Sequence, residues 1–354
     1  MAQQEGERIF ERAPWVSLVC GSASYSKLPQ LLAQVEAGQR RVTGLSTDTD
    51  ETFETEMTRR DNPLRAYVTI IEGCNKACTY CVVPRTRGPE RSRHSESILR
   101  EIRELAGVGY TEVQLLGQTV NSYRDPSGLR FADLLGAVAA TPGIRRVRFM
   151  TSHPNDLDAE TVAAMASLPQ LCEHIHLPVQ SGSTRILRAM QRTYTREEYL
   201  QKIAMIRSID RPIGITTDII VGFPGETESD FEQTLSLLDE VHYDGAFCFQ
   251  YSPRPNTPAA AMAEAVPDEE KSRRLAVLLE KQRLIQTARN EALVGQSFEV
   301  LVEGASLTPG QWIGRTSSNR TLNITSSRPA LLGEYVIAKV THAGANSLAG
   351  VEVF

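Results

Sequence analysis

Three cysteines lie close together in the stretch EGCNKACTYCVVPRTRG at residues 72–88. Cys74, Cys78 and Cys81 have the spacing C-x3-C-x2-C and follow the apolar run AYVTII. Iron–sulfur clusters are held by cysteine thiolates and usually take four of them. A loop with three thiolates can hold three irons of a 4Fe-4S cube and leaves the fourth iron open to an exogenous ligand. The spacing therefore predicts an open cluster as the active centre.

Two other interpretations use the same three cysteines. They could form a structural zinc site, or an electron-transfer cluster whose fourth ligand is Cys172 or Cys248. Zinc knuckles favour paired C-x2-C units. The loop does not have that pattern, so we favour the open cluster.

Length and composition limit the class of protein. The chain has 354 residues, 41% of them hydrophobic, which is enough for one large domain and a smaller one. No apolar run approaches the roughly 18 residues of a membrane span, and the polar start MAQQEGERIFER does not resemble a signal peptide. Six cysteines are too few for a disulfide scaffold. We expect a cytoplasmic protein without membrane contact.

The charge balance gives a weaker indication. A net charge of -5 argues against wholesale binding of nucleic acid. It still allows a local basic patch on an acidic body.

Short apolar strands alternate with amphipathic helices between residues 64 and 250. Six β-α units in succession predict an α/β fold with a parallel sheet and right-handed crossovers, curled into a partial (β/α)6 barrel. A complete eight-unit barrel usually takes about 250 residues, which is more than this stretch offers. The expected strands are 66–71, 112–116, 146–151, 173–177, 214–221 and 245–251.

Polar residues follow these strands at the end where parallel α/β folds bind their ligands. Any one of them could belong to an ordinary turn. Their recurrence after successive strands predicts a shared site. The candidates are Gln118, Asn121, Ser152, His153, Gln180 and Ser181, with Asp218 inside the fifth strand and SPRPNT after the sixth.

The regions on either side of the barrel differ in pattern. Residues 1–62 combine a helix, the strand WVSLVC and a second helix with a polar linker that begins near Gly38, and this reads as the remnant of an α/β domain. Pro267 opens a long charged helix. Its basic residues favour a solvated face over an RNA-contacting arm, and they are Arg273, Arg274, Lys281 and Arg283.

The last sixty or so residues change to a period of two. Five short strands separated by Gly, Pro and Asn turns predict a small barrel of the OB type, which often binds nucleic acid. Composition alone leaves a dimerisation module equally open. The exposed candidates are Arg315, Asn319, Arg320 and Arg328. The predicted divisions of the chain are 1–62, a barrel at 63–265, a connecting helix at 266–293 and an RNA-binding barrel at 294–354.

Over nearly its whole length the sequence resembles the methylthiotransferases of the radical S-adenosylmethionine (SAM) group. It is most similar to those members that modify isopentenyladenosine next to the tRNA anticodon. The C-terminal region is similar to the TRAM RNA-binding barrel. The matching strings are EGCNKACTYCVVPRTRG, LLGQTVNSY, TSHPNDL, HIHLPVQSGS, TTDIIVGFPGETESDF and YSPRPNTPAA.

The resemblance implies cofactors and residue roles. The three cysteines would hold a [4Fe-4S] cluster whose open iron is chelated by SAM, and cleavage of SAM would give a radical that attacks C2 of the adenine. Tyr80 would lie near the SAM adenine. Polar contacts to SAM would come from Gln118, Asn121, Ser152, Gln180, Ser181 and Asp218.

Further residues could contact RNA. Arg87, Arg91 and Arg93 would form a basic rim for tRNA phosphates, or else pair with nearby carboxylates. Arg315 and Arg320 are the candidates in the C-terminal barrel. The expected partners are tRNA and an electron donor such as flavodoxin or ferredoxin, and we expect a monomer.

One feature of the family is missing from this sequence. Its members carry an N-terminal domain whose three cysteines hold a second, sulfur-donating cluster, and Cys20 matches none of those positions. We expect a shortened sequence or a misplaced start codon, and a chain that cleaves SAM without completing sulfur insertion.

The competing hypotheses are a non-catalytic RNA-binding protein, or a relative that acts on threonylcarbamoyladenosine in tRNA or on a ribosomal protein aspartate. The three cysteines and the strand-end polar residues favour an enzyme.

Overall fold

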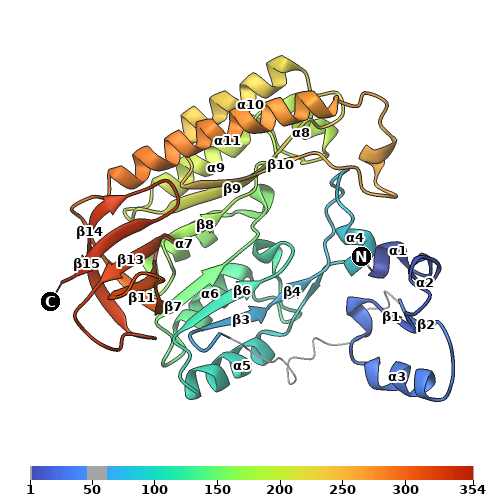
Figure 1. Ribbon diagram of the computed structural model, residues 1–354, viewed down its shortest axis with the longest axis horizontal. Coiled ribbons are helices and arrows are strands. Elements are labelled where there is room, and N and C mark those ends of the chain that lie inside the picture. Colours follow the sequence, from blue (N-terminus) through green and yellow to red (C-terminus); the bar gives the residue numbers. More distant parts are fainter. Residues whose placement is uncertain (1, 46–61, 354) are drawn as a thin grey trace.

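Six parallel strands form the centre of the molecule (Figure 1). A computed structural model describes residues 2–45 and 62–353 of the chain. The strands run in sequence order from one edge to the other, in two three-stranded ladders. The ladders meet where Val147 bridges Leu171 and the amide of Ser152 donates to the carbonyl of His176 at 3.3 Å. In order, the strands are β3 (Arg65–Thr69), β6 (Glu112–Leu116), β7 (Arg146–Phe149), β8 (His174–His176), β9 (Gly214–Val221) and β10 (Gly245–Gln250).

This partial barrel confirms the predicted fold class. Alternate side chains of each strand point to opposite faces of the sheet. Residues such as Val113, Leu115 and Ile219 are buried in the main hydrophobic core with the surrounding helices. Many of the residues between them are polar and include Glu112 and Asp218. The sheet therefore has an apolar outer face and an interior with many polar groups.

Two of the helices that cover the outer face begin at capping boxes. The hydroxyl of Thr195 accepts from the amide of Glu198, and Thr227 does the same for Asp230; both pairs complete capping boxes. The covering helices are α5 (Ser95–Gly107), α6 (Phe131–Ala139), α7 (Ala159–Ser167), α8 (Thr184–Ala189), α9 (Arg196–Arg207) and α10 (Glu228–Val241).

The N-terminal segment is a small α/β unit beside the barrel (Figure 1). Its first helix is divided at Gly6, which has a φ of 55°, so one predicted helix becomes two. A three-residue strand lies within the expected linker and pairs in parallel with the predicted strand. Residues 46–61 of that linker lie outside the described residues. The elements are α1 (Ala2–Glu5), α2 (Arg8–Arg12), β1 (Leu18–Cys20), α3 (Leu28–Glu36) and β2 (Val42–Gly44).

The C-terminal part follows the predicted pattern. Helix α11 (Asp268–Glu291) begins directly after Pro267 and packs on α10 and β10. The five strands close into a barrel in the order β11-β12-β13-β15-β14 around a core of its own. Their bounds are β11 (Ser297–Ala305), β12 (Gln311–Thr316), β13 (Thr321–Thr325), β14 (Tyr335–Ala343) and β15 (Leu348–Glu352).

The C-terminal barrel packs against the amino ends of the central strands. Arg148 donates to the carbonyl of Ser317 at 2.9 Å, and the amide of Glu173 donates to the hydroxyl of Ser317 at 3.0 Å. The carboxyl ends of the strands lie at the opposite edge. None of the helices described is long and apolar enough to cross a membrane.

Candidate cluster-binding site

The three cysteines of the loop line one cavity of about 390 Å³ at the carboxyl ends of the central strands. Residues that follow β6, β7 and β8, together with Asp218 of β9, form the rest of the wall. This is where a parallel α/β sheet places its ligands. The lining residues are Cys74, Lys76, Cys78, Tyr80, Cys81, Val83, Gly117, Gln118, Thr119, Thr151, Ser152, His153, Pro178, Gln180, Arg192 and Asp218.

The cysteine loop is fixed at both of its ends. It begins after the short strand β4 (Ile71–Glu72), which pairs with β5 (Arg91–Ser92). Gly73 has a φ of 73°, and a Cβ there would lie 2.0 Å from the carbonyl oxygen of Pro89. Only glycine fits this close approach. The loop runs into helix α4 (Val83–Arg87), against which α1 packs.

The middle of the loop is tied to the end of helix α8. The amide of Thr79 donates to the carbonyl of Met190 at 3.0 Å, and its hydroxyl donates to the carbonyl of Ala189 at 3.0 Å. Lys76 forms an ion pair with Asp156 at 2.7 Å. The loop is therefore held from two neighbouring segments of the barrel.

Each of the three sulfur atoms lies near one N–H donor. The amide of Lys76 donates to the Sγ of Cys74 at 3.5 Å, and the amide of Val83 donates to the Sγ of Cys81 at 3.4 Å. The Sγ of Cys78 accepts from Nη1 of Arg192 at 3.4 Å. Hydrogen bonds of this kind are typical around the sulfurs of iron–sulfur clusters.

The arrangement fits a cluster better than a single ion. Within residues 2–45 and 62–353, no three Cys, His, Asp or Glu side chains converge closely enough to hold one metal ion. The three cysteines line one cavity. In a cubic cluster each of them would bind a different iron. The donor set thus fits a 4Fe-4S cluster with one open corner.

Polar atoms without a protein partner face this site. Among the described residues, Oε1 of Gln118 and Oγ of Ser152 are buried without a hydrogen bond, although both residues line the cavity. Buried polar groups are normally paired, so each such atom requires an explanation. A ligand with polar groups in the cavity would supply the missing partners.

A second cavity of about 330 Å³ adjoins the first. Tyr80, Gln180 and Asp218 line both cavities, so the two are neighbouring parts of one site. Tyr251 lines the second cavity, and among the described residues its hydroxyl too is buried without a partner. The ring of Phe249, on the last strand, is about half exposed there.

The backbone of the site carries local strain. Thr151 and Gln180 have φ values of 69° and 74°, a region that residues with a Cβ rarely occupy. Both residues line the cavity. Such conformations cost of order 1–3 kcal/mol each and concentrate at functional sites.

Burial determines the protonation of the groups around the cavity. Desolvation, together with the cations of Arg192 and Lys76, lowers the pKa of His153 to about 2, so this imidazole is neutral. Burial alone would lower the pKa of Arg192. Tyr194, Tyr80 and Cys78 more than offset this effect and raise the pKa, so the guanidinium stays charged.

The structure brings most of the predicted site residues together. Tyr80, Gln118, Ser152, Gln180 and Asp218 line the cavity with the three cysteines. Two other predicted contacts do not line it.

Asn121 and Ser181 have other partners. The side chain of Asn121 donates to the carbonyl of His153 at 2.9 Å and accepts from its amide at 2.8 Å. Ser181 is fully buried and accepts from the amide of Ser183 at 3.2 Å. Asn121 thus positions the backbone of a lining residue.

The basic residues next to the cysteine loop differ in exposure. Arg87 is exposed. Arg91 pairs with Glu72 at 3.3 Å. Arg93 is 4% exposed and pairs with Glu101. The placement of Arg91 and Arg93 favours the alternative that they are partners for carboxylates.

The two arginines proposed for the C-terminal barrel lie at its inner interface. Arg320 pairs with Asp244 and donates to Oδ1 of Asn290 at 3.0 Å. Arg315 lies 3.4 Å from a carboxylate oxygen of Glu303. Each guanidinium has a carboxylate partner, so neither is an unpaired charge on the surface of the barrel.

Several lining residues were missed by the sequence reasoning. Thr119 and Thr151 lie within or next to matched strings and could have been found there. Pro178 belongs to PVQSGS, from which only the polar residues were chosen. Arg192 lies outside all the matched strings and three residues beyond α8, so neither spacing nor motif indicated it.

The two suggested fourth ligands lie elsewhere. Neither Cys172 nor Cys248 is among the residues that line the cavity. Cys172 is buried near Ser317 of the C-terminal barrel, at the opposite edge of the sheet.

Comparison with known proteins first defines the class. The sequence profile of the Radical SAM superfamily matches residues 68–238, and that of the TRAM domain matches residues 291–353. The superfamily is characterised by a [4Fe-4S] cluster and SAM. Among solved structures, the radical SAM methyltransferase TsrM from Kitasatospora setae has a TM-score of 0.56 at 15% identity. The aligned part covers 73% of this chain and 55% of TsrM, and it shows a common fold.

Curated relatives define the family. A tRNA-2-methylthio-N(6)-dimethylallyladenosine synthase from Solibacter usitatus (strain Ellin6076) is 62% identical over 99% of this chain and 80% of its own length. A protein of the same name from Koribacter versatilis (strain Ellin345) is 58% identical over the same shares. The chain belongs to this family, which is the branch of the radical SAM methylthiotransferases that its sequence most resembles.

Proposed function

We propose that the protein is a tRNA methylthiotransferase that adds a methylthio group to C2 of N6-isopentenyladenosine beside the anticodon. The observation that carries this proposal is the cavity at the carboxyl ends of the strands. Three cysteine sulfurs line it, and polar atoms without partners face it. The names of the relatives supply the substrate class.

The cysteines and SAM would share one cluster. Cys74, Cys78 and Cys81 would hold three irons of a [4Fe-4S] cluster, and the amino and carboxylate groups of SAM would chelate the fourth. When bound, the cluster and SAM supply a one-electron cleavage of the sulfonium that generates a 5'-deoxyadenosyl radical. The protein supplies binding, orientation and exclusion of water.

The lining residues would bind and orient SAM. Gln118 and Ser152 offer hydrogen-bonding atoms that have no protein partner among the described residues. Tyr80 lies between the two cavities with Gln180 and Asp218, and this position suits the SAM adenine and ribose. The second cavity would then receive the target base. The isopentenyl group of that base is apolar and would pack on the ring of Phe249. Asn121 and Ser181 would support the same site through the backbone.

The C-terminal barrel would hold the tRNA. We propose the boundaries 1–62, 63–265, 266–293 and 294–354 for the parts of the chain. Arg87 is exposed beside the cysteine loop and could meet phosphates. We further propose a cytoplasmic monomer that is reduced by flavodoxin or ferredoxin.

Anaerobic reconstitution with iron and sulfide tests the chemistry. The loaded protein should contain about four irons per chain and release 5'-deoxyadenosine and methionine from SAM when dithionite is added. If the protein loads a cluster and does not cleave SAM, the remaining hypothesis is a non-catalytic RNA-binding protein. The variants Gln118→Ala and Ser152→Ala should weaken SAM binding while keeping the iron.

Mass spectrometry of tRNA tests the substrate. Cells that lack the gene should lose the methylthio group on isopentenyladenosine and retain the isopentenyl group. If that nucleoside is intact and threonylcarbamoyladenosine or a ribosomal protein aspartate is altered, the substrate assignment is wrong.

A further inference from the structure

The three cysteine sulfurs do not have the same kind of hydrogen-bond donor. Cys74 and Cys81 each accept from the backbone amide two residues further along the chain. Cys78 accepts instead from the guanidinium of Arg192, 114 residues away in sequence, at 3.4 Å. The sulfur of Cys78 is therefore in contact with a full positive charge.

Arg192 is buried and firmly held. It is 5% exposed, its Nη2 donates to the carbonyl of Pro178 at 3.0 Å, and its Nε donates to the hydroxyl of Tyr194 at 2.9 Å. That hydroxyl donates in turn to the carbonyl of Val179 at 2.9 Å. Three contacts in three directions leave the guanidinium little freedom to turn away from the sulfur.

This cation has no carboxylate partner in the part of the chain that the structure describes. Its contacts are two neutral oxygens and the sulfur of Cys78. Buried charges are normally paired, because an unpaired ion is costly to remove from water. The remaining contact that could balance the charge is the sulfur of Cys78, at 3.4 Å.

The backbone on both sides of Arg192 is in an unusual conformation. Gln191 has a φ of 54° and Thr193 has a φ of 55°. A β-branched residue such as threonine rarely adopts this region. Strain of this kind persists where the surrounding structure requires a particular side-chain position.

We propose that Arg192 is a positioning residue that raises the reduction potential of the cluster through its contact with the sulfur of Cys78. The inference rests on the proposed function, since it assumes that Cys78 holds a cluster. Reduction adds one electron from an external one-electron donor and makes the cluster with its three thiolates more negative by one charge. A fixed cation at hydrogen-bond distance stabilises the reduced form more than the oxidised form.

The neighbouring residues give this contact a structural basis. Thr79, next to Cys78, is bonded to the carbonyls of Ala189 and Met190, just before Arg192. The segment that carries the cation is thus attached to the loop that carries the sulfur. The distance between the two charges is set by the fold and does not depend on a flexible side chain alone.

A redox titration of the reconstituted protein without SAM tests this inference, with electron paramagnetic resonance as the readout. In Arg192→Gln the ratio of reduced to oxidised cluster at a fixed potential should fall about tenfold, equivalent to a shift of about 59 mV to lower potential for a one-electron couple. Tyr194→Phe keeps the cation and removes one of its anchors, so it should shift the potential in the same direction by less. Arg192→Lys keeps the charge and should lie between Arg192→Gln and the wild type.

Arg188→Gln is the matched control. Arg188 is an exposed arginine on α8, and its replacement removes the same charge without a contact to sulfur. It should leave the potential unchanged. Circular dichroism of the iron-free proteins checks that all variants are folded.

The outcomes separate this inference from the proposed function. If the wild type does not load a cluster, the proposed function fails. If Arg192→Gln has the reduction potential of the wild type, the inference about Arg192 is overturned. If Arg192→Gln does not load a cluster, the same conclusion follows when Arg192→Lys and Tyr194→Phe both have the potential of the wild type. Weaker SAM binding with an unchanged potential would also overturn it, because Arg192 would then act on the SAM carboxylate.

Discussion

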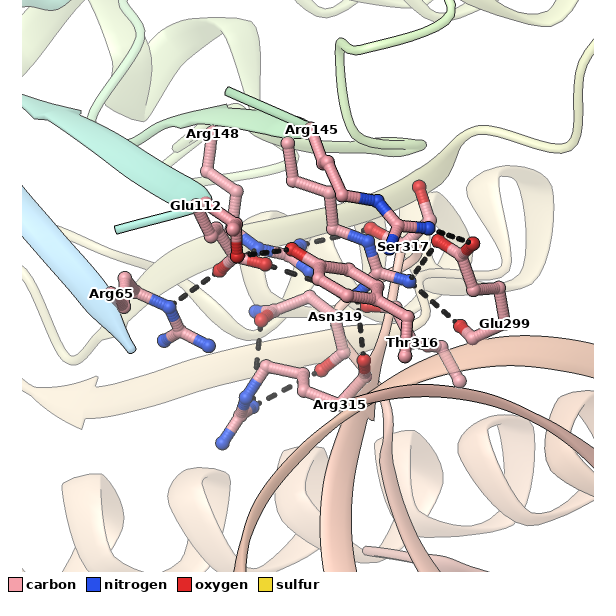
Figure 2. A network of polar contacts seen from close by, with 12 residues as sticks. Arg65, Glu112, Arg145, Arg148, Glu299, Arg315, Thr316, Ser317 and Asn319 are labelled. Carbon is pink, nitrogen blue, oxygen red and sulfur yellow. Dashed lines mark hydrogen bonds and ion pairs between the residues drawn. The ribbon is translucent and has the colours of Figure 1, made fainter. Parts of the chain in front are cut away.

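The two edges of the central sheet are both polar, and they differ in how their charges are paired. At the amino ends of the strands, Glu112 is fully buried and lies within 3.8 Å of Arg146 and 2.9 Å of Arg148, and Arg65 also bonds it. The C-terminal barrel covers this edge. Figure 2 shows Arg65 and Arg148 directed toward Glu112, and Arg145 directed toward Glu299 of that barrel. Arg148 also donates to the carbonyls of Thr316 and Ser317.

At the carboxyl ends the pairing is incomplete. Oε1 of Gln118 and Oγ of Ser152 lack partners among the described residues, and Arg192 faces a sulfur atom where a carboxylate would be expected. The three cysteines line the cavity at this edge. The comparison indicates that one edge is built for stability and the other for ligands.

The electrostatics of Glu112 agree with its structural role. Burial by itself would raise the pKa of this carboxyl group. The neighbouring cations Arg148, Arg65 and Arg146 more than offset burial and lower the pKa, so Glu112 is ionised. The three arginines that share this buried anion also bond groups of the C-terminal barrel, so this group of charges joins the two barrels.

Removing a cysteine should have the largest effect at the ligand edge. Cys78→Ala should abolish cluster loading and SAM cleavage, because one iron loses its only protein ligand. The free energy of unfolding of the iron-free protein should change by no more than about 1 kcal/mol, since the site is partly exposed. Iron analysis, the visible absorption spectrum and urea denaturation measure these quantities.

Cys20→Ala is the matched control for this experiment. Cys20 lies on β1, outside the cavity, and its replacement should leave the iron content unchanged. Full iron content in Cys78→Ala would contradict the assignment of the cluster to this loop.

Removing the buried anion should have the largest effect at the covered edge. Glu112→Gln leaves three buried guanidinium groups without the charge that they share, and this should cost about 3–5 kcal/mol of the free energy of unfolding. Urea denaturation of the iron-free protein measures the loss. At low temperature, where the variant is folded, it should still load the cluster. If Glu112→Gln failed to load the cluster and had the stability of the wild type, the covered edge would serve ligand binding and not stability.

Most of the fold could be predicted from local patterns. Apolar runs located the six central strands because each buries a continuous outer face against helices. A period of two located the five strands of the closed barrel, whose inward side chains form a separate core. The strand β2 was missed because three residues in a polar segment are too few to produce a pattern.

The site could be predicted in part. Strand-end position identified Gln118, Ser152 and Gln180, because parallel strands bring their carboxyl ends to one edge. It could not separate them from Asn121 and Ser181, which lie in the same turns but whose side chains bond backbone groups of the protein. Arg192 was not predictable because its role depends on how the chain after α8 packs on the cysteine loop.

The arginines show the same limit most clearly. Arg93, Arg315 and Arg320 were chosen as surface residues for RNA, and each has a carboxylate partner within the structure. A carboxylate such as Glu101 is visible in the sequence, but its distance from a given arginine is set by packing. Docking of the C-terminal barrel against the sheet is tertiary information that no local pattern contains.

Acid should destabilise the protein through its buried histidines. Burial, with the cation of Arg148 nearby, lowers the pKa of His174 to about 3, whereas an unfolded histidine titrates near 6.5. Between these values the unfolded chain binds a proton that the folded chain does not, so stability falls as the pH falls from 6.5 toward 3. From pH 6.5 to pH 5 the loss should be about 2 kcal/mol for this residue.

Urea denaturation at both pH values measures this loss. His174→Gln should show a smaller difference between pH 6.5 and pH 5, because its side chain does not titrate. His342→Gln is the matched control, since His342 is exposed on β14 and its replacement should leave the pH dependence unchanged. Equal slopes in the wild type and His174→Gln would show that His174 does not carry the effect.

The smallest expected effect lies at the rim of the covered edge and tests whether burial is what matters there. Glu299 pairs with Arg145 at 2.9 Å and with Arg146 at 3.1 Å, and its side chain is 43% exposed. Water and salt screen such a pair, so Glu299→Gln should cost no more than about 1 kcal/mol and less at high salt. Urea denaturation at low and high ionic strength measures it. A loss as large as that of Glu112→Gln would mean that the number of ion pairs across the interface, and not the burial of Glu112, determines the strength of the contact between the two barrels.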